Sequence, residues 1–442
     1  MSFSARNRTR YIQQLQEETF DLLVIGGGIT GAGIALDAVA RGLKVCLIEK
    51  ADFASGTSSR STKLIHGGLR YLKQLEFGIV REVGQERTIL YKNAPHIVIP
   101  ERMLLPIIEG GSLGKYSTSL GLYVYDRLAG VEKDERRNML SKEKTLEQEP
   151  LLNTSILKGG GMYVEYRSDD ARLCVEVMKT AVEKGALCVN YVAFNSFTHT
   201  VSNKVNGANC TDMINNIHFH IKAKKIINAC GPWVDELRKK DNSLHKKRLH
   251  LTKGIHIVIP KERLPIQQAV YFDVEDGRMI FAIPRGKKIY LGTTDTNYNE
   301  DKNFPYAHKE DVIYILNAAN HMFPSAELKI EEVESTWAGL RPLIHEDGKS
   351  PSDLSRKDEI FISDSNLISI AGGKLTGYRK MAERSVNVVC KQLKIEEGRQ
   401  FNPCATEFIK LSGGHLEKYP NEYARDLQDD FKQFYLDDVL DL

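Results

Sequence analysis

Residues 22–33 read Leu-Leu-Val-Ile-Gly-Gly-Gly-Ile-Thr-Gly-Ala-Gly, so that an apolar strand runs straight into a glycine turn that opens a helix. Gly26, Gly28 and Gly31 fill the frame G-x-G-x-x-G, and Glu49 ends the next apolar run about twenty residues further on. Gly26 permits the tight turn, Gly28 lets backbone N–H groups approach a pyrophosphate, and Gly31 lets the helix pack on the strand. The positive end of the helix dipole stabilises the negative charge of the pyrophosphate, and the Glu49 carboxylate can accept hydrogen bonds from the ribose hydroxyls. Because strand, glycines, helix and acid stand in register, we favour dinucleotide binding over an unrelated glycine-rich turn.

Bulk properties limit the classes of function. A chain of 442 residues suggests about two or three domains. Its net charge of +3 provides no global field for nucleic acid. The seven cysteines are scattered without a C-x-x-C pair, so we expect neither a disulfide framework nor a metal site, and a cytoplasmic location fits. No signal peptide is predicted, and the most apolar window, residues 22–40, is better explained by the βαβ unit than by a membrane span.

The periodicity along the chain predicts two kinds of layer. Apolar residues recur at helical spacing over residues 168–184, and strands flank this segment. Between residues 255 and 291 the pattern changes to short β runs separated by turns, which is typical of an antiparallel sheet. Residues 367–374 return to an apolar strand with a glycine turn, and a helix is expected from Thr376 to about Leu393. We therefore predict one discontinuous nucleotide-binding domain with an inserted β domain.

The predicted boundaries follow from these changes of pattern. Residues 20–95, 165–250 and 337–395 are assigned to the nucleotide domain, and residues 96–164 and 251–336 to the substrate domain. Residues 1–19 form an N-terminal arm, for which a solvated segment is preferred over a basic amphipathic helix. Residues 396–442 form a C-terminal helical segment whose apolar stripe comprises Leu427, Phe431, Phe434 and Tyr435.

Further motifs favour a long dinucleotide such as FAD. Gly372 and Gly373 follow an apolar strand and offer a second helix N-terminus, able to stabilise negative charge on a reduced flavin. Gly231 supplies another close backbone approach, and the loop at residues 57–61 is rich in hydroxyls that can bond phosphate and flavin edges. The predicted cofactor-binding residues are Gly26, Gly28, Gly31, Glu49, Thr57, Ser58, Ser59, Ser61, His66, Gly231, Gly372, Gly373 and Thr376.

Five segments beyond the first glycine turn carry a family resemblance. They span residues 57–71, 228–234, 253–256, 337–343 and 372–379. With these motifs, the chain resembles over about residues 20–415 the FAD-dependent (aerobic, respiratory) glycerol-3-phosphate dehydrogenase family, close to the Gram-positive bacterial type. The resemblance implies an α/β fold: a glutathione-reductase-type Rossmann domain with an inserted antiparallel β domain (D-amino-acid-oxidase-like) and a short C-terminal helical segment. Family members usually continue for roughly another hundred residues, so the C-terminal helical domain is expected to be shortened at Leu442.

The resemblance also implies an activity and partners. It implies that sn-glycerol 3-phosphate is oxidised to dihydroxyacetone phosphate, with electrons passing through FAD to a membrane quinone. It further implies that the protein is attached peripherally to the inner face of the cell membrane. Assembly into a homodimer is a further expectation. Two alternatives remain open: an oxidase of the same superfamily that releases peroxide, and a catalytically silent FAD-binding remnant.

Cations and histidines supply the candidate catalytic groups. The resemblance implies that Arg70, Arg341 and Lys374 clamp the substrate phosphate with Tyr71 beside them, and Arg suits bidentate phosphate recognition. For a single Arg the alternative is a surface ion pair, and Arg356 and Arg379 are weaker candidates. Removing the hydroxyl proton requires a base, and the matched segments hold three candidate histidines. The resemblance places His256 facing the flavin as base, and we predict this role for it, with His66 second and His345 on a loop.

Overall fold

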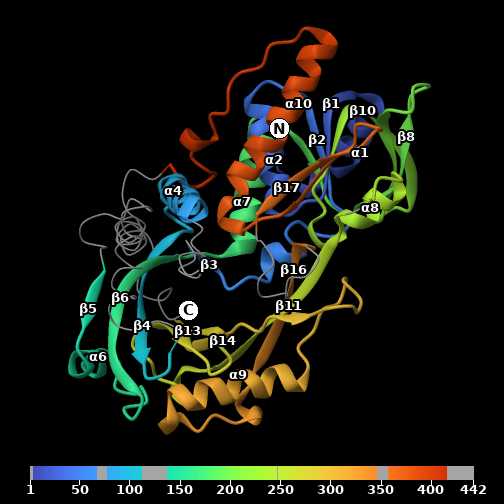
Figure 1. Cartoon of the computed structure of the whole chain (residues 1–442). Helices are drawn as coiled ribbons and strands as arrows, with labels where there is room; N and C mark the ends of the chain where they lie inside the picture. The colour runs from blue at the N-terminus through green and yellow to red at the C-terminus, as the bar shows by residue number, and fades with distance from the viewer. Residues whose placement is uncertain (1–2, 67–76, 112–136, 246, 346–356, 416–442) are drawn as a thin grey trace, which may run out of the picture.

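The structure is a computed structural model that describes residues 3–66, 77–111, 137–245, 247–345 and 357–415. These residues form two sheets, which occupy different halves of the molecule in Figure 1. The first sheet is mostly parallel and has helices on both faces, whereas the second is mostly antiparallel and has helix α9 along one face. Among the described helices, none has the length and hydropathy that crossing a membrane requires.

The first sheet is the nucleotide-binding layer. Its strand order is β17-β18-β10-β1-β2-β7, and β18, β10, β1, β2 and β7 run parallel to their neighbours. Strand β17 is antiparallel to β18, and the hairpin of β8 and β9 extends from β10. The bounds of the strands are β1 (Thr19–Ile25), β2 (Val45–Ile48), β7 (Leu187–Val189), β8 (Val192–His199), β9 (Val205–Asp212), β10 (Ile217–Asn228), β17 (Asp358–Ile362) and β18 (Ile368–Gly372).

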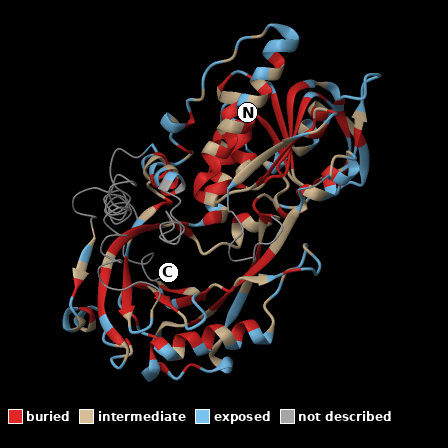
Figure 2. Ribbon diagram, viewed as in Figure 1, coloured by how far each residue is buried: buried red, intermediate tan, exposed pale blue. Residues whose placement is uncertain are grey.

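Strand β1 has two buried faces because both sides of this sheet are covered. Leu22 and Val24 face the core shared with α2 (Ile29–Ala40), α7 (Asp170–Glu183) and α10 (Tyr378–Glu397). Leu23 and Ile25 face the opposite core, which includes residues of α1 (Arg8–Glu17) and α8 (Val234–Lys240). Successive side chains of a strand point to opposite faces, so a strand in the middle of three layers is apolar throughout. Figure 2 shows this buried centre.

The N-terminal segment is a helix and not a solvated arm. In α1, Ile12 is 5% exposed and Leu15 is fully buried. Arg8 bonds Asp212 at 2.5 Å, which ties the start of the helix to the end of β9. Its apolar stripe therefore packs on the first sheet, and the preferred sequence interpretation of residues 4–19 was wrong.

The second sheet is the substrate-domain layer. Its order is β15-β11-β14-β13-β12-β4-β6-β3, with β16 paired to β11 and β5 to β6. The predicted β runs within residues 255–291 are antiparallel to one another, and β12 is parallel to β4. The bounds are β3 (Leu64–Ile65), β4 (Ile99–Ile108), β5 (Asn138–Leu140), β6 (Leu157–Arg167), β11 (Leu249–Pro260), β12 (Ala269–Asp273), β13 (Met279–Arg285), β14 (Lys288–Gly292), β15 (Thr296–Asn297) and β16 (Ser335–Ile344).

Helices cover only part of this second layer. Helix α9 (Lys309–Met322) packs on Ile255 and Ile257 of β11, whereas α4 (Phe77–Asn93) and α6 (Lys142–Gln148) contact β6. The second sheet includes β16 and so extends beyond residue 336, the limit expected from the sequence. Gly339 and Arg341 interrupt the apolar pattern of that strand, which hid it. The stripe at Leu427–Tyr435 lies outside the described residues.

Candidate active site between the two sheets

The first glycine turn has no room for side chains. Gly26 has φ +114°, and a Cβ there would lie 2.6 Å from the Ala229 carbonyl oxygen. A Cβ on Gly31 would lie 1.9 Å from the carbonyl oxygen of Gly26. Gly28 is the N-cap of α2 and gives that helix no side-chain cap. A close backbone turn at the positive end of a helix fits a dinucleotide pyrophosphate.

Glu49 stands directly beside this turn. One carboxylate oxygen accepts a hydrogen bond from Gly27 N at 2.7 Å, and the other accepts one from Ala51 N at 2.9 Å. These bonds fix the carboxylate at the end of β2, next to the glycine turn. The half-buried oxygens retain further lone pairs for the hydroxyls of a ribose.

Two further glycine turns lie at the same edge of the sheet. Gly231 has φ +52° and follows β10, whereas Gly372 and Gly373 have φ +77° and +80° and end β18. Strands β1, β10 and β18 are parallel neighbours, so their carboxyl ends meet at one edge. Ligands of open α/β sheets bind at this edge. The three glycine turns along this edge let the backbone approach a bound ligand at three points, which suits a ligand as long as FAD. Thr376, which is buried, follows the third turn.

The hydroxyl loop folds onto the protein itself. Thr57 donates to Leu340 O at 2.8 Å, and Ser59 donates to Gly56 O at 3.3 Å. Ser58 accepts from Ile29 N at 2.9 Å, in the first turn of α2. These contacts shape the loop between the two sheets, and flavin contacts of these hydroxyls stay a prediction.

Asp170 anchors the end of the same loop. This fully buried carboxylate accepts from Ser61 N at 3.0 Å, from Ser61 Oγ at 2.7 Å and from Lys63 Nζ at 2.7 Å. The sequence places Asp170 only within the predicted helical segment at residues 168–184. Its pairing with residues more than a hundred positions away has no local signal.

His256 lies on the face of β11 opposite to α9. Its ring stacks on Trp337 with centroids 4.6 Å apart and an interplanar angle of 11°, and Tyr290 meets it edge-on at 6.2 Å. Nε2 lies 3.1 Å from Thr62 Oγ1. Burial, and then the charges of Arg341 and Lys63, lower the pKa of His256 to about 3. The imidazole is therefore neutral at pH 7.

Arg341 lies on the same sheet face as His256. Nη1 donates to Thr294 O at 3.1 Å and contacts Asp295 Oδ1 at 3.2 Å, while Nη2 donates to Thr293 Oγ1 at 3.0 Å. A Cβ at Gly254 would lie 2.2 Å from Nη2. The guanidinium therefore lies across the backbone of β11 and is directed by the turn after β14.

Glycines form the floor between these two groups. Gly254 and His256 share one face of β11, Gly339 shares the face of Arg341 on β16, and Gly292 pairs with His256 from β14. A Cβ on Gly292 would lie 2.2 Å from the His256 ring, and one on Gly339 would lie 2.5 Å from Arg60 O. The sequence analysis did not single out Gly254, Gly292 or Gly339, although glycine inside a strand signals a close backbone approach.

Strand β16 joins this face to the cofactor edge. It contacts the 3₁₀ turns at Thr57–Ser59 and Gly231–Trp233, and it also contacts β18. Lys374 is half-buried and directly follows the turn after β18. The predicted cation Lys374 thus follows β18, a strand that contacts β16, the strand of Arg341.

The remaining candidates are distributed differently. His66 lies edge-on to Phe281 at 5.9 Å, whereas His345 lies beyond the end of β16, away from Trp337. Arg70, Tyr71 and Arg356 fall outside the described residues.

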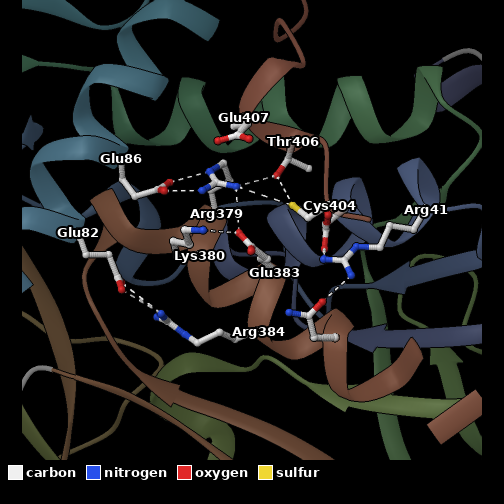
Figure 3. Close-up of polar contacts among 12 residues, drawn as sticks. Arg41, Glu82, Glu86, Arg379, Lys380, Glu383, Arg384, Cys404, Thr406 and Glu407 are labelled. Carbon is white, nitrogen blue, oxygen red and sulfur yellow. Dashed lines mark hydrogen bonds and ion pairs between the residues drawn. The ribbon is translucent and has the colours of Figure 1, made fainter. Parts of the chain in front are cut away.

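Arg379 belongs to a separate buried network. Its guanidinium bonds both carboxylate oxygens of Glu86 on α4, one of them at 2.8 Å, and Thr406 Oγ1 at 3.3 Å, as Figure 3 shows. Arg384 likewise bonds Glu82 of α4 at 3.2 Å. These pairs tie α10 to α4 and the C-terminal segment, so Arg379 is a structural ion-pair residue in this fold.

Comparison with known proteins identifies relatives of this chain. The family described as FAD dependent oxidoreductase matches residues 21–377. The aerobic glycerol-3-phosphate dehydrogenase of Staphylococcus saprophyticus is 57% identical over 417 residues, covering 94% of this chain and 75% of the relative. The solved glycerol-3-phosphate dehydrogenase of Bacillus halodurans complexed with FAD has a TM-score of 0.80 and 50% identity, covering 98% of this chain and 75% of that one. An L-α-glycerophosphate oxidase from Mycoplasma pneumoniae shares the fold, with a TM-score of 0.66 at 20% identity, over 87% of this chain and 96% of that one.

Proposed function

Because the chain belongs to the FAD-dependent glycerol-3-phosphate dehydrogenase family, we propose that it oxidises sn-glycerol 3-phosphate to dihydroxyacetone phosphate. The observation in the fold that carries this proposal is the glycine-floored sheet face that presents His256 and Arg341 together. A base and a phosphate-binding cation on one face suit a phosphorylated secondary alcohol. The family, the fold class and FAD as cofactor, all predicted from the sequence, are confirmed.

Arg341, Arg70 and Lys374 bind the substrate phosphate in this proposal. A phosphate monoester carries about −1.5 to −2 charges at pH 7 and offers three strong acceptor oxygens. The Asp295 contact and the Thr293 and Thr294 bonds hold the Arg341 guanidinium before substrate arrives. Preorganised donors lose less conformational entropy on binding, which favours phosphorylated over unphosphorylated polyols.

His256 is the base that takes up a proton when the substrate hydroxyl is deprotonated. When bound, FAD supplies the hydride acceptor. Gly26, Gly28, Gly31, Glu49 and the turns at Gly231 and Gly372 would hold it. Burial, and then the neighbouring positive charges, keep His256 neutral, and a bound phosphate dianion offsets those charges so that protonation becomes easier.

The electrons then pass to a membrane quinone. The name dehydrogenase, shared by the relatives at 56–57% identity, supports an acceptor other than oxygen. We propose peripheral attachment to the inner membrane face, supported by exposed Arg6, in the 3₁₀ turn before α1, and exposed Arg10, in the first turn of α1. A cationic helix end is attracted to anionic lipid.

Acceptor preference tests this function. The FAD-loaded protein should reduce a soluble quinone analogue when given sn-glycerol 3-phosphate and should form dihydroxyacetone phosphate in equal amount. Glycerol and the opposite enantiomer serve as control substrates and should be poor. Rapid oxygen uptake with peroxide release, in the absence of quinone, would identify an oxidase. Quinone reduction that is equally fast with glycerol would show that the protein does not recognise the substrate phosphate.

A further inference from the structure

His256 is almost completely buried. The residue is 2% exposed. Trp337 covers one face of the ring, Tyr290 lies at its edge, and the backbone of Gly292 lies against its Cδ2 side. Proton transfer requires a donor within about 3.2 Å of the base or one intervening hydroxyl or water. A buried ring of this kind calls for an intervening group.

Thr62 is the group that meets the ring. Its Oγ1 lies 3.1 Å from His256 Nε2, whereas the buried Nδ1 has no hydrogen-bond partner among the residues that the structure describes. Within the described part of the chain, Nδ1 stays without a hydrogen bond in either neutral tautomer. The free-energy cost of burying it therefore does not favour one tautomer over the other. The tautomer with its proton on Nδ1 leaves the Nε2 lone pair free to accept from the Thr62 hydroxyl.

Three residues outside the loop, Tyr290, Asp170 and Trp337, fix the position of Thr62 within it. Tyr290 Oη donates to the Thr62 carbonyl oxygen at 3.0 Å. Ser61 and Lys63, on either side, bond the buried carboxylate of Asp170. Trp337 Nε1 donates to Ser61 O at 3.2 Å, so the residue that stacks on the imidazole also fixes the loop. Thr62 itself is half-buried and belongs to the loop that lies between the two sheets.

We propose that Thr62 relays the proton from the substrate hydroxyl to His256. This inference rests on the proposed function. The substrate O–H bond breaks as its proton moves to Thr62 Oγ1, and the proton of Thr62 moves to His256 Nε2. The electron pair of the O–H bond becomes part of the new C=O bond. The hydrogen on the same carbon would leave as hydride, with its electron pair, for the FAD that Gly26, Gly28, Gly31 and Glu49 would hold, so charge and electrons would balance.

Three variants and one control test the relay by anaerobic flavin reduction in rapid mixing. Thr62→Val removes the hydroxyl at nearly constant volume and should slow flavin reduction by roughly 10²–10⁴-fold, as should His256→Ala. Thr62→Ser should recover the rate to within a few-fold. The double variant should be no slower than either single variant, because both residues act in one chain. Thr336→Val, an exposed substitution on the opposite face of β16, is the matched control and should leave the rate unchanged.

Binding measurements separate a relay from a structural role. FAD content and the affinity for dihydroxyacetone phosphate, followed by perturbation of the flavin spectrum, should be the same in Thr62→Val and wild type. Loss of either would show that Thr62 only shapes the loop. Reduction at the wild-type rate in Thr62→Val, with His256→Ala slow, would show direct contact and overturn the relay.

The wild-type protein offers a test that depends on no variant. A relay moves two protons together, so the reduction rate should fall along a curve as the deuterium fraction of the solvent rises. A straight line would indicate one proton in motion and would contradict the relay. If sn-glycerol 3-phosphate fails to reduce the wild-type flavin at all, the proposed function fails; the relay alone fails when reduction is normal and the line is straight.

Discussion

Replacing His256 should change how folding stability depends on pH. Burial, followed by the charges of Arg341 and Lys63, lowers the pKa of this imidazole from 6.5 to about 3. Between those values the unfolded chain binds a proton that the folded protein excludes, so stability falls as the pH falls below 6.5. Each pH unit in this window removes about 1.4 kcal/mol, and the loss between pH 6.5 and 5 is roughly 2 kcal/mol. Above pH 6.5 both states are neutral and the effect vanishes.

His256→Gln removes this proton linkage and keeps a polar group near Thr62. Urea unfolding of both proteins, from pH 7 to 5 with a constant excess of FAD, gives the free energy of unfolding at each pH. Titrating groups shared by the two proteins cancel in the difference. The advantage of wild type over the variant should shrink by roughly 2 kcal/mol on going to pH 5. Parallel pH dependences would show that His256 takes up a proton as readily when folded as when unfolded, and would refute the burial argument.

Three other substitutions test the two halves of the site. Glu49→Ala should weaken FAD binding by roughly 1.5–3 kcal/mol through lost charge-assisted hydrogen bonds, measured by flavin fluorescence; unchanged affinity would remove Glu49 from the cofactor site. Gly31→Ala places a Cβ 1.9 Å from Gly26 O and should abolish FAD binding and lower the melting temperature. Gly78→Ala should be neutral or stabilising, because a Cβ at this helix position meets no described atom within 4 Å outside its own stretch of helix. Arg341→Ala should raise the KM for sn-glycerol 3-phosphate by roughly 10- to 100-fold with FAD content intact, the loss of a charge-assisted phosphate contact; equal losses with glycerol would make Arg341 structural.

Features encoded by neighbouring residues could be predicted from the sequence. The glycine turn at residues 26–31 and Glu49 follow a spacing fixed by one strand and one helix, so their meeting is local. The alternating short runs within residues 255–291 likewise predicted antiparallel strands, because the period of two is a property of each strand alone.

Features that depend on strand register could not be predicted. His256 meets Trp337 because β11 and β16 pair across about eighty residues of chain, and no local pattern reports that register. Register also buries the imidazole and brings it to Thr62. Arg379 shows the converse, because the sequence left it as a weaker candidate for the phosphate clamp, whereas the fold pairs it with Glu86, almost three hundred residues away.

The helix at residues 8–17 was misjudged for a related reason. A solvated arm was preferred because chain termini are poorly ordered unless contacts hold them. Here Arg8 pairs with the buried carboxylate of Asp212 and also donates to the carbonyl oxygens of Asn190 and Tyr191. Two apolar residues, Ile12 and Leu15, then suffice to pack the helix because the sheet provides the remaining apolar surface.

Anaerobic titration of the FAD-loaded protein with sn-glycerol 3-phosphate tests the central claim most directly. The flavin absorbance should bleach fully, and one equivalent of dihydroxyacetone phosphate should form for each flavin reduced. Glycerol at the same concentration should leave the flavin oxidised, because the cations around Arg341 then have no phosphate to bind. A flavin that stays oxidised with glycerol 3-phosphate, yet is reduced by dithionite, would contradict the account.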